Sequence, residues 1–282
     1  MSLFSQSGTD LVVDVAGYYE PVTTSSRPGR YTPLSPTRIL DTRIALGVPA
    51  TTPVPADTQI DLAVAGHGGV PATGAAAVVL NVTAAESLGA GFVTVWPAGN
   101  TRPTASTLNV TFAGQNIANL VIVPIGANGS VSLYTQTGTH LIADVAGWFG
   151  DDTQQPDVAG LFIPVDPARV LDTRSALGVP TTTPVPPDTA IVLAIAGHGG
   201  TPATGIGAVV LNVTAAQATA PGFITVWPSD QPQPTASNLN VTAAGQNIPN
   251  LVSVSVSAAG AVSLYTQTGT HLVADIAGFY TR

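Results

Sequence analysis

The stretch SLYTQTGTHLIADVAGWF occupies residues 132–149, and SLYTQTGTHLVADIAGFY occupies residues 263–280. A third version, SLFSQSGTDLVVDVAGYY, occupies residues 2–19. Placing each residue n beside residue n+131 aligns 31–150 with 162–281 without a gap, and 80 of these 120 pairs are identical. Repetition at a fixed spacing is the sequence signature of tandem structural units. The chain is therefore predicted to contain two modules, preceded by a third copy of the ending that lacks a body.

The repeat spacing also sets the predicted domain boundaries. Residues 31–150 and 162–282 form the two modules, and the polar, Pro- and Gly-containing segments 21–30 and 151–161 are predicted linkers. Residues 1–20 are predicted to be the C-terminal hairpin of a preceding repeat, as in a piece of a longer array. A lone hairpin is marginal in water. We expect it to pack on the next module, to pair with another chain by strand addition, or to aggregate.

Each module shows the periodicity of strands. Runs rich in β-branched and aromatic residues are bounded by Gly, Pro, Asn and Ser, and helical spacing is nowhere sustained. The expected strands of the first module are 37–43, 58–66, 77–84, 91–96, 106–112, 119–125, 130–136 and 139–149. This pattern predicts an all-β chain of two tandem sandwich-like modules, each with two sheets.

An alternative architecture stays open. The strings IDLAVAG, STLNVTFAG and HLIADVAG resemble one another, so each module is also compatible with three degenerate subunits. A β-trefoil or a β-prism would produce such a threefold pattern. The spacing between the three strings is uneven, which favours the sandwich.

Composition excludes several classes of function. Charged residues make up 9% of the chain, the net charge is −8, and all eight basic residues are Arg. A chain of this charge is not expected to bind nucleic acid, which requires clustered basic side chains. The absence of Cys excludes thiolate metal sites and thiol nucleophiles. No apolar run approaches the roughly 20 residues of a membrane-spanning helix, so membrane insertion is not predicted.

The Arg and Asp residues of the LDTR segments are the first candidates for a role. Arg38, Asp41 and Arg43 recur 131 residues later, and an Asp lies within each apolar IADVAG or VADIAG segment. An isolated buried charge is prohibitively costly, so we expect structural ion pairs, with Asp41 also capping a turn. The expected bridge joins Asp144 to Arg43 or to Arg38. The second module contributes the equivalent Arg169, Asp172, Arg174 and Asp275.

Two tryptophans are the second candidates. Trp96 and Trp227 end the strands GFVTVWP and GFITVWP. Core packing is one interpretation, and a platform that stacks on a sugar ring is the other, because an aromatic face offers a flat apolar surface.

The ordered series PLSPTRILDTR, VAGHGGVPATG, AVVLNVTAAE, GFVTVWPAG, AGQNIANLVIVPIG and HLIADVAGWF resembles a tandem β-repeat of secreted and surface proteins of actinobacteria and other bacteria. The resemblance covers both modules, and the segment at residues 2–19 matches the ending of the repeat. It implies an extracellular or cell-surface setting and no established chemistry. The resemblance also implies a Cys near the GHGG turn in many relatives, and this chain has none.

Other motifs predict no chemistry. Each module has one His in each of two separate turns, which is too few for a metal site, and no nucleophile elbow accompanies its Ser, His and Asp. Neither a metal nor another cofactor is predicted. The repeated NVT strings begin at Asn81, Asn109, Asn212 and Asn240. Their amides are expected to bridge neighbouring backbone groups.

Two functions follow from these patterns. The favoured prediction is a structural or adhesive repeat without catalysis, which acts as a spacer or assembly unit and meets neighbouring repeats or other copies through residues 1–20. The alternative is a carbohydrate- or cell-wall-binding module that uses Trp96 and Trp227 and gains avidity from repetition.

Overall fold

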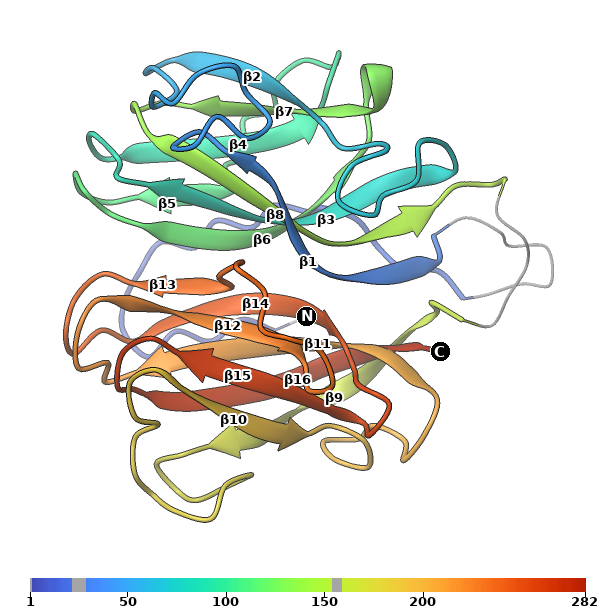
Figure 1. Ribbon diagram of the computed structural model, residues 1–282, viewed down its shortest axis with the longest axis vertical. Helices are drawn as coiled ribbons and strands as arrows, with labels where there is room; N and C mark the ends of the chain where they lie inside the picture. The colour runs from blue at the N-terminus through green and yellow to red at the C-terminus, as the bar shows by residue number, and fades with distance from the viewer. Residues whose placement is uncertain (1, 22–28, 154–158) are drawn as a thin grey trace.

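The computed structural model describes residues 2–21, 29–153 and 159–282, and shows two β-sandwiches that lie side by side (Figure 1). The parts of the predicted linkers at 22–28 and 154–158 lie outside the described residues. The first sandwich contains β1 (Tyr31–Asp41), β2 (Thr58–Ala63), β3 (Ala75–Ala85), β4 (Gly91–Pro97), β5 (Leu108–Val110), β6 (Ile117–Pro124), β7 (Ser130–Thr135) and β8 (His140–Gly150). The second contains β9 (Phe162–Asp172), β10 (Thr189–Ala194), β11 (Ile206–Ala216), β12 (Gly222–Pro228), β13 (Leu239–Val241), β14 (Ile248–Ser255), β15 (Ala261–Thr266) and β16 (His271–Thr281).

Each module consists of two four-stranded antiparallel sheets. In the first module the order β1-β8-β3-β6 packs on β2-β7-β4-β5, and the second repeats this as β9-β16-β11-β14 on β10-β15-β12-β13. The predicted pair of sandwiches is confirmed. The threefold alternative is wrong, because its three similar strings fall on both edges of one sheet (β2 and β5) and in the centre of the other (β8). In the described residues, no helix is long and apolar enough to cross a membrane.

Strict alternation along the strands explains the sandwich core. On β3, the side chains of Val78, Leu80 and Val82 point inward into the core between the two sheets, and those of Val79 and Asn81 point outward. The second module has its own equivalent core. Because successive side chains alternate between faces, a strand with apolar residues on both faces has a second surface to bury. The second surface of β3 is covered by the other module.

A third apolar cluster joins the modules. Val79 and Val210, which lie on the outer faces of β3 and β11, are both buried in it. The cluster contains equivalent residues of both modules, namely Ala77 with Ala208, Val79 with Val210, Ala146 with Ala277, Phe149 with Tyr280 and Tyr31 with Phe162. The strand contacts around this cluster are not reciprocal, since β1 packs on β14 and β6 packs on β13. The two modules nevertheless cover each other as a pair.

Polar contacts fix the pair at its edges. The side chain of Asn250 donates a hydrogen bond of 3.0 Å to Asn81, which in turn donates one of 2.6 Å to the carbonyl of Ser237. The backbone N–H of Leu120, on edge strand β6, donates to Asn250 at 3.3 Å. Edge strands expose unpaired backbone groups that invite aggregation. Here each module covers part of the other's edge, since β6 and β14 are in contact.

The ends of the repeats converge on one group of aromatic rings. Phe149 and Tyr280, the last aromatic residues of the two modules, have ring centroids 6.1 Å apart. Tyr31 contacts both rings, and its hydroxyl donates to the carbonyl of Ala146 at 2.9 Å. A Cβ at Gly147 would collide with the Tyr31 ring, and a Cβ at Gly278 would collide with the Phe162 ring, so the glycines of the DVAG and DIAG endings leave room for these rings. The third copy also contributes, because Tyr19 stacks on Phe162 at 4.4 Å.

The hairpin predicted for residues 1–20 is not formed. Residues 2–21 contain no strand, and their large apolar side chains are 51–92% exposed. The reason lies in the topology: the two strands of the same sequence, β7 and β8, belong to different sheets and pair with four other strands rather than with each other. The segment thus carries the sequence of two central strands but has none of their partners. The segment contacts the second module through Tyr19, whose hydroxyl lies 2.7 Å from that of Tyr280.

Candidate functional site

The Arg and Asp residues of the first module form one connected network. Arg38 binds Asp144 through Nε at 2.9 Å and Nη2 at 3.4 Å, and reaches Asp41 through Nη1 at 3.1 Å. Arg43 binds Asp41 at 2.8 Å, so the Arg43–Asp144 alternative is not formed. Asp41 also accepts the backbone N–H of Arg43 at 3.1 Å, in the turn expected for it. The bridge ties β1, at the edge of its sheet, to β8.

Burial and hydrogen bonding act in opposite directions on the two carboxylates. Burial raises the pKa of Asp144 above its usual range, although Arg38 counteracts it. Burial would also raise the pKa of Asp41, but the hydrogen bonds from Arg43 hold it below the usual range. The two Arg and two Asp residues carry no net charge together. The network is therefore neutral, and both of its carboxylates are buried.

The second module repeats this geometry in a more exposed setting. Arg169 binds Asp275 at 2.8 Å and Asp172 at 3.2 Å, and Arg174 binds Asp172 at 2.7 Å. Hydrogen bonds from Arg174 hold the pKa of Asp172 well below its usual range. The side chain of Asp275 is 28% exposed, whereas that of Asp144 is 2% exposed. The difference arises because the second module covers the first network, where Arg38 also donates to the carbonyl of Thr235 at 3.4 Å.

The two tryptophans do not offer a stacking surface. Trp96 and Trp227 are 3% and 6% exposed, and each indole N–H donates to a backbone carbonyl four residues later. A buried ring has no face for a sugar. The glycan-stacking interpretation of these two residues is therefore wrong, and they are core residues that fasten the loop after their own strand.

The histidines serve the fold in a similar way. The Nδ1 atom of His140 lies 2.8 Å from the hydroxyl of Thr42, and His271 repeats this contact with Thr173 at 2.9 Å. Over residues 2–21, 29–153 and 159–282, no group of three or more His, Asp or Glu side chains is placed to hold a metal ion.

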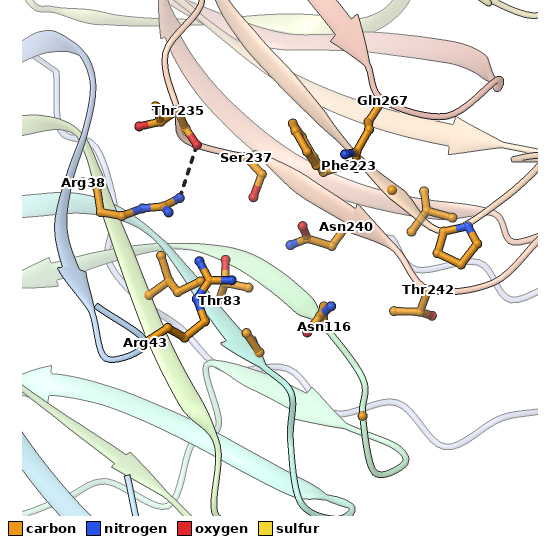
Figure 2. Close-up of a pocket in the computed structure, with 16 residues that line it drawn as sticks. Arg38, Arg43, Thr83, Asn116, Phe223, Thr235, Ser237, Asn240, Thr242 and Gln267 are labelled. Carbon is orange, nitrogen blue, oxygen red and sulfur yellow. Dashed lines mark hydrogen bonds between the residues drawn. The ribbon is translucent and has the colours of Figure 1, made fainter. Parts of the chain in front are cut away.

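One concave site lies between the modules and was not predicted. It is a cleft of about 500 Å³ (Figure 2). One wall comes from the first module and includes Arg38, Arg43, Thr83, Ala85, Gly114, Asn116 and Ile142. The other comes from the second module and includes Pro221, Gly222, Phe223, Thr235, Ser237, Asn240, Val241, Thr242 and Gln267. We call this site the inter-module cleft.

Two atoms of the inter-module cleft have unused hydrogen-bonding capacity. Of the three buried side-chain nitrogen or oxygen atoms that lack a hydrogen-bond partner in the described part of the chain, two line the cleft: Thr83 Oγ1 and Asn240 Nδ2. They come from opposite walls (Figure 2). The NVT pattern predicted amides that bridge neighbouring backbone groups. Asn81 instead donates to the carbonyl of Ser237 in the other module, and the amide nitrogen of Asn240 has no partner among the described residues. Buried polar groups without partners are rare and call for an explanation.

Comparisons with known proteins identify no family. No family model and no curated protein matches the chain. Among solved structures, the N-terminal CBM22-1-CBM22-2 tandem domain from Paenibacillus barcinonensis Xyn10C aligns over 82% of this chain and 85% of its own, with 10% sequence identity and a TM-score of 0.22. At that TM-score the likeness carries no argument about function. The resemblance to the bacterial surface repeat stays a prediction.

Proposed function

We propose that the chain is a non-catalytic structural repeat of a secreted or cell-surface protein, in which two modules act as one rigid spacer. The observation that supports this most directly is the cluster between the modules, in which Val79 and Val210 are both buried. Two domains joined by a large apolar contact do not reorient freely. The two modules therefore behave as a single rigid body.

The sheet faces used for the contact define how such a spacer is built. Because each module covers the outer face of its own β1-containing or β9-containing sheet with its partner, that face is not available to a further module. We propose that neighbouring repeats, or other copies of the chain, are engaged elsewhere, through residues 2–20. Tyr19 supports this, since this residue of the third copy contacts Phe149 and Tyr280, the last aromatic residues of the two modules.

Small-angle X-ray scattering of the variant Val79→Asp tests the rigid pair. A carboxylate in the apolar cluster would be costly to bury, so we expect the modules to separate and the maximum dimension to increase. The matched control is Val192→Asp, at a residue that is 63% exposed on β10 and far from the contact, and its scattering should equal that of the parent. A parent profile that fits only independently moving modules would contradict the proposal, as would an unchanged profile for a folded Val79→Asp.

Carbohydrate or cell-wall binding is the second candidate function. Trp96 and Trp227, the residues expected to bind the sugar, cannot do so because both are buried. Its remaining support is the inter-module cleft, whose two walls each contain a polar atom without a partner among the described residues.

A further inference from the structure

We propose that the inter-module cleft is a binding site for an uncharged, hydroxyl-rich ligand, specifically a neutral sugar unit of a polysaccharide. This goes beyond the spacer role and depends on it in one respect, since the cleft exists only while the two modules are packed. Its volume of about 500 Å³ falls within the range of small-ligand sites, roughly 300–1,000 Å³.

The unpartnered atoms indicate what kind of ligand fits. Thr83 is 3% exposed, and its hydroxyl, which can both donate and accept, has no partner among the described residues. The amide nitrogen of Asn240 carries two donor hydrogens and also lacks a partner there. A sugar hydroxyl both donates and accepts, so its chemistry is complementary to both groups.

The remaining lining has the same character. Asn116 and Gln267 add amides, Ser237 and Thr242 add hydroxyls, and Phe223 supplies an aromatic ring. Phe223 packs against Tyr265 with ring centroids 5.7 Å apart, which holds its ring in place. An aromatic ring beside several amides offers both an apolar surface for the C–H face of a sugar and hydrogen bonds for its edge.

The charges of the site favour a neutral ligand over an anionic one. Arg38 and Arg43 are the charged side chains of the lining, and each is committed to a carboxylate at 2.8–2.9 Å. Their partners, Asp41 and Asp144, are almost fully buried, so the positive charge is already balanced. A phosphate or uronate would have to compete with these pairs, in a chain whose net charge is −8.

The repeat provides matched controls for the test. Asn109 is the equivalent of Asn240 and is exposed on β5, away from the cleft. Phe92 is the equivalent of Phe223 and makes the same contact with Tyr134, at 5.8 Å, but does not line the cleft. Each pair of variants removes the same chemical group from the same local fold.

The experiment is an NMR titration of the ¹⁵N-labelled chain with cellohexaose, xylohexaose, maltohexaose and chitohexaose, with polygalacturonate as the anionic comparison. The side-chain amide signal of Asn240 is assigned from its loss in Asn240→Ala. We expect at least one neutral oligosaccharide to shift this signal and those of Asn116 and Gln267. Asn240→Ala and Phe223→Ala should each raise the Kd about five- to tenfold, while Asn109→Ala and Phe92→Ala leave it unchanged.

Scattering by the parent is recorded first, so that a failure of the spacer role is recognised separately. A packed parent whose cleft amides respond to none of the four neutral sugars would overturn the cleft proposal and leave the spacer intact. Binding of polygalacturonate alone would overturn it too, as would equal effects of Asn240→Ala and Asn109→Ala. A parent with separated modules would overturn both proposals.

Discussion

Removal of Arg38 should destabilise the protein far more than removal of its equivalent, Arg169. Arg38 and Asp144 share a two-point contact in which the carboxylate is 2% exposed. Replacing one partner of a buried pair typically costs 3–5 kcal/mol, because the other charge is left uncompensated. Arg169 and Asp275 are 46% and 28% exposed, and exposed pairs contribute about 0–1 kcal/mol. Arg38→Met should therefore cost about 3 kcal/mol and Arg169→Met less than about 1 kcal/mol.

Differential scanning calorimetry and urea unfolding at pH 7 measure this difference. A loss of about 3 kcal/mol corresponds to a fall in Tm of about 10 °C for a unit of this size. The same measurement in acid checks the cause. Burial raises the pKa of Asp144 even with Arg38 present, and removal of Arg38 raises it further, so the penalty is present above that pKa and shrinks as the pH falls through it.

Equal losses for Arg38→Met and Arg169→Met would refute the reasoning. The two pairs have the same residue types and nearly the same distances, 2.9 and 2.8 Å, so they differ in burial and in the bond of Arg38 to the carbonyl of Thr235. A large loss for Arg38→Met that stayed constant between neutral and acid pH would also count against it, since that pattern indicates lost packing of the side-chain stem rather than an uncompensated charge.

Three further predictions concern the aromatic residues and the N-terminal segment. Burial raises the pKa of Tyr31 and Tyr280 far above the usual value of about 10. The stability that these two side chains confer is therefore present below pH 10 and lost as the pH rises. Ultraviolet titration should show these two of the six tyrosines ionising only on unfolding. The substitution Trp148→Phe removes the third tryptophan, so that only Trp96 and Trp227 fluoresce. Their fluorescence should resist quenching by acrylamide and should not change on addition of glycans, because both rings are buried. Strong quenching would contradict their core role. Deletion of residues 2–20 should lower the free energy of unfolding by about 1 kcal/mol through loss of the stacking of Tyr19 on Phe162. If the segment joins copies of the chain, the deletion should instead reduce the oligomeric mass. An unchanged mass by light scattering together with an unchanged Tm would rule out both roles.

Sequence periodicity predicted most of the strands because it reflects burial directly. The expected strand 77–84 corresponds to β3, Ala75–Ala85, whose inward face is the sandwich core. The first strand was predicted to begin at Thr37, whereas β1 begins at Tyr31. Pro33 and Pro36 obscured its start, since Pro lacks a ladder donor. They are tolerated because β1 lies at the sheet edge and its register shifts between Pro33 and Thr37.

The error at the N-terminal segment has a different origin. Two strand-like runs separated by the short QTGT turn are a strong hairpin signal in isolation. In a sandwich, however, a short connection can also cross from one sheet to the other, as it does between β7 and β8. Local spacing is identical in the two cases. Only the identity of the pairing partners distinguishes them, and those partners lie far away in the sequence.

The inter-module cleft could not be predicted from the repeats. Their sequences are nearly identical, but the two walls of the cleft use non-equivalent residues of the two modules. Thr83 and its equivalent Thr214 are the same residue in the same strand position, yet Thr83 is buried at the cleft and Thr214 does not line it. Asn240 and Asn109 differ in the same way. Each module contributes a different part of its surface, so one module supplies Thr83 and the other supplies Asn240. A single module holds every residue type of the site but only one of its walls, and therefore a ligand that needs both walls would recognise the pair and not the repeat.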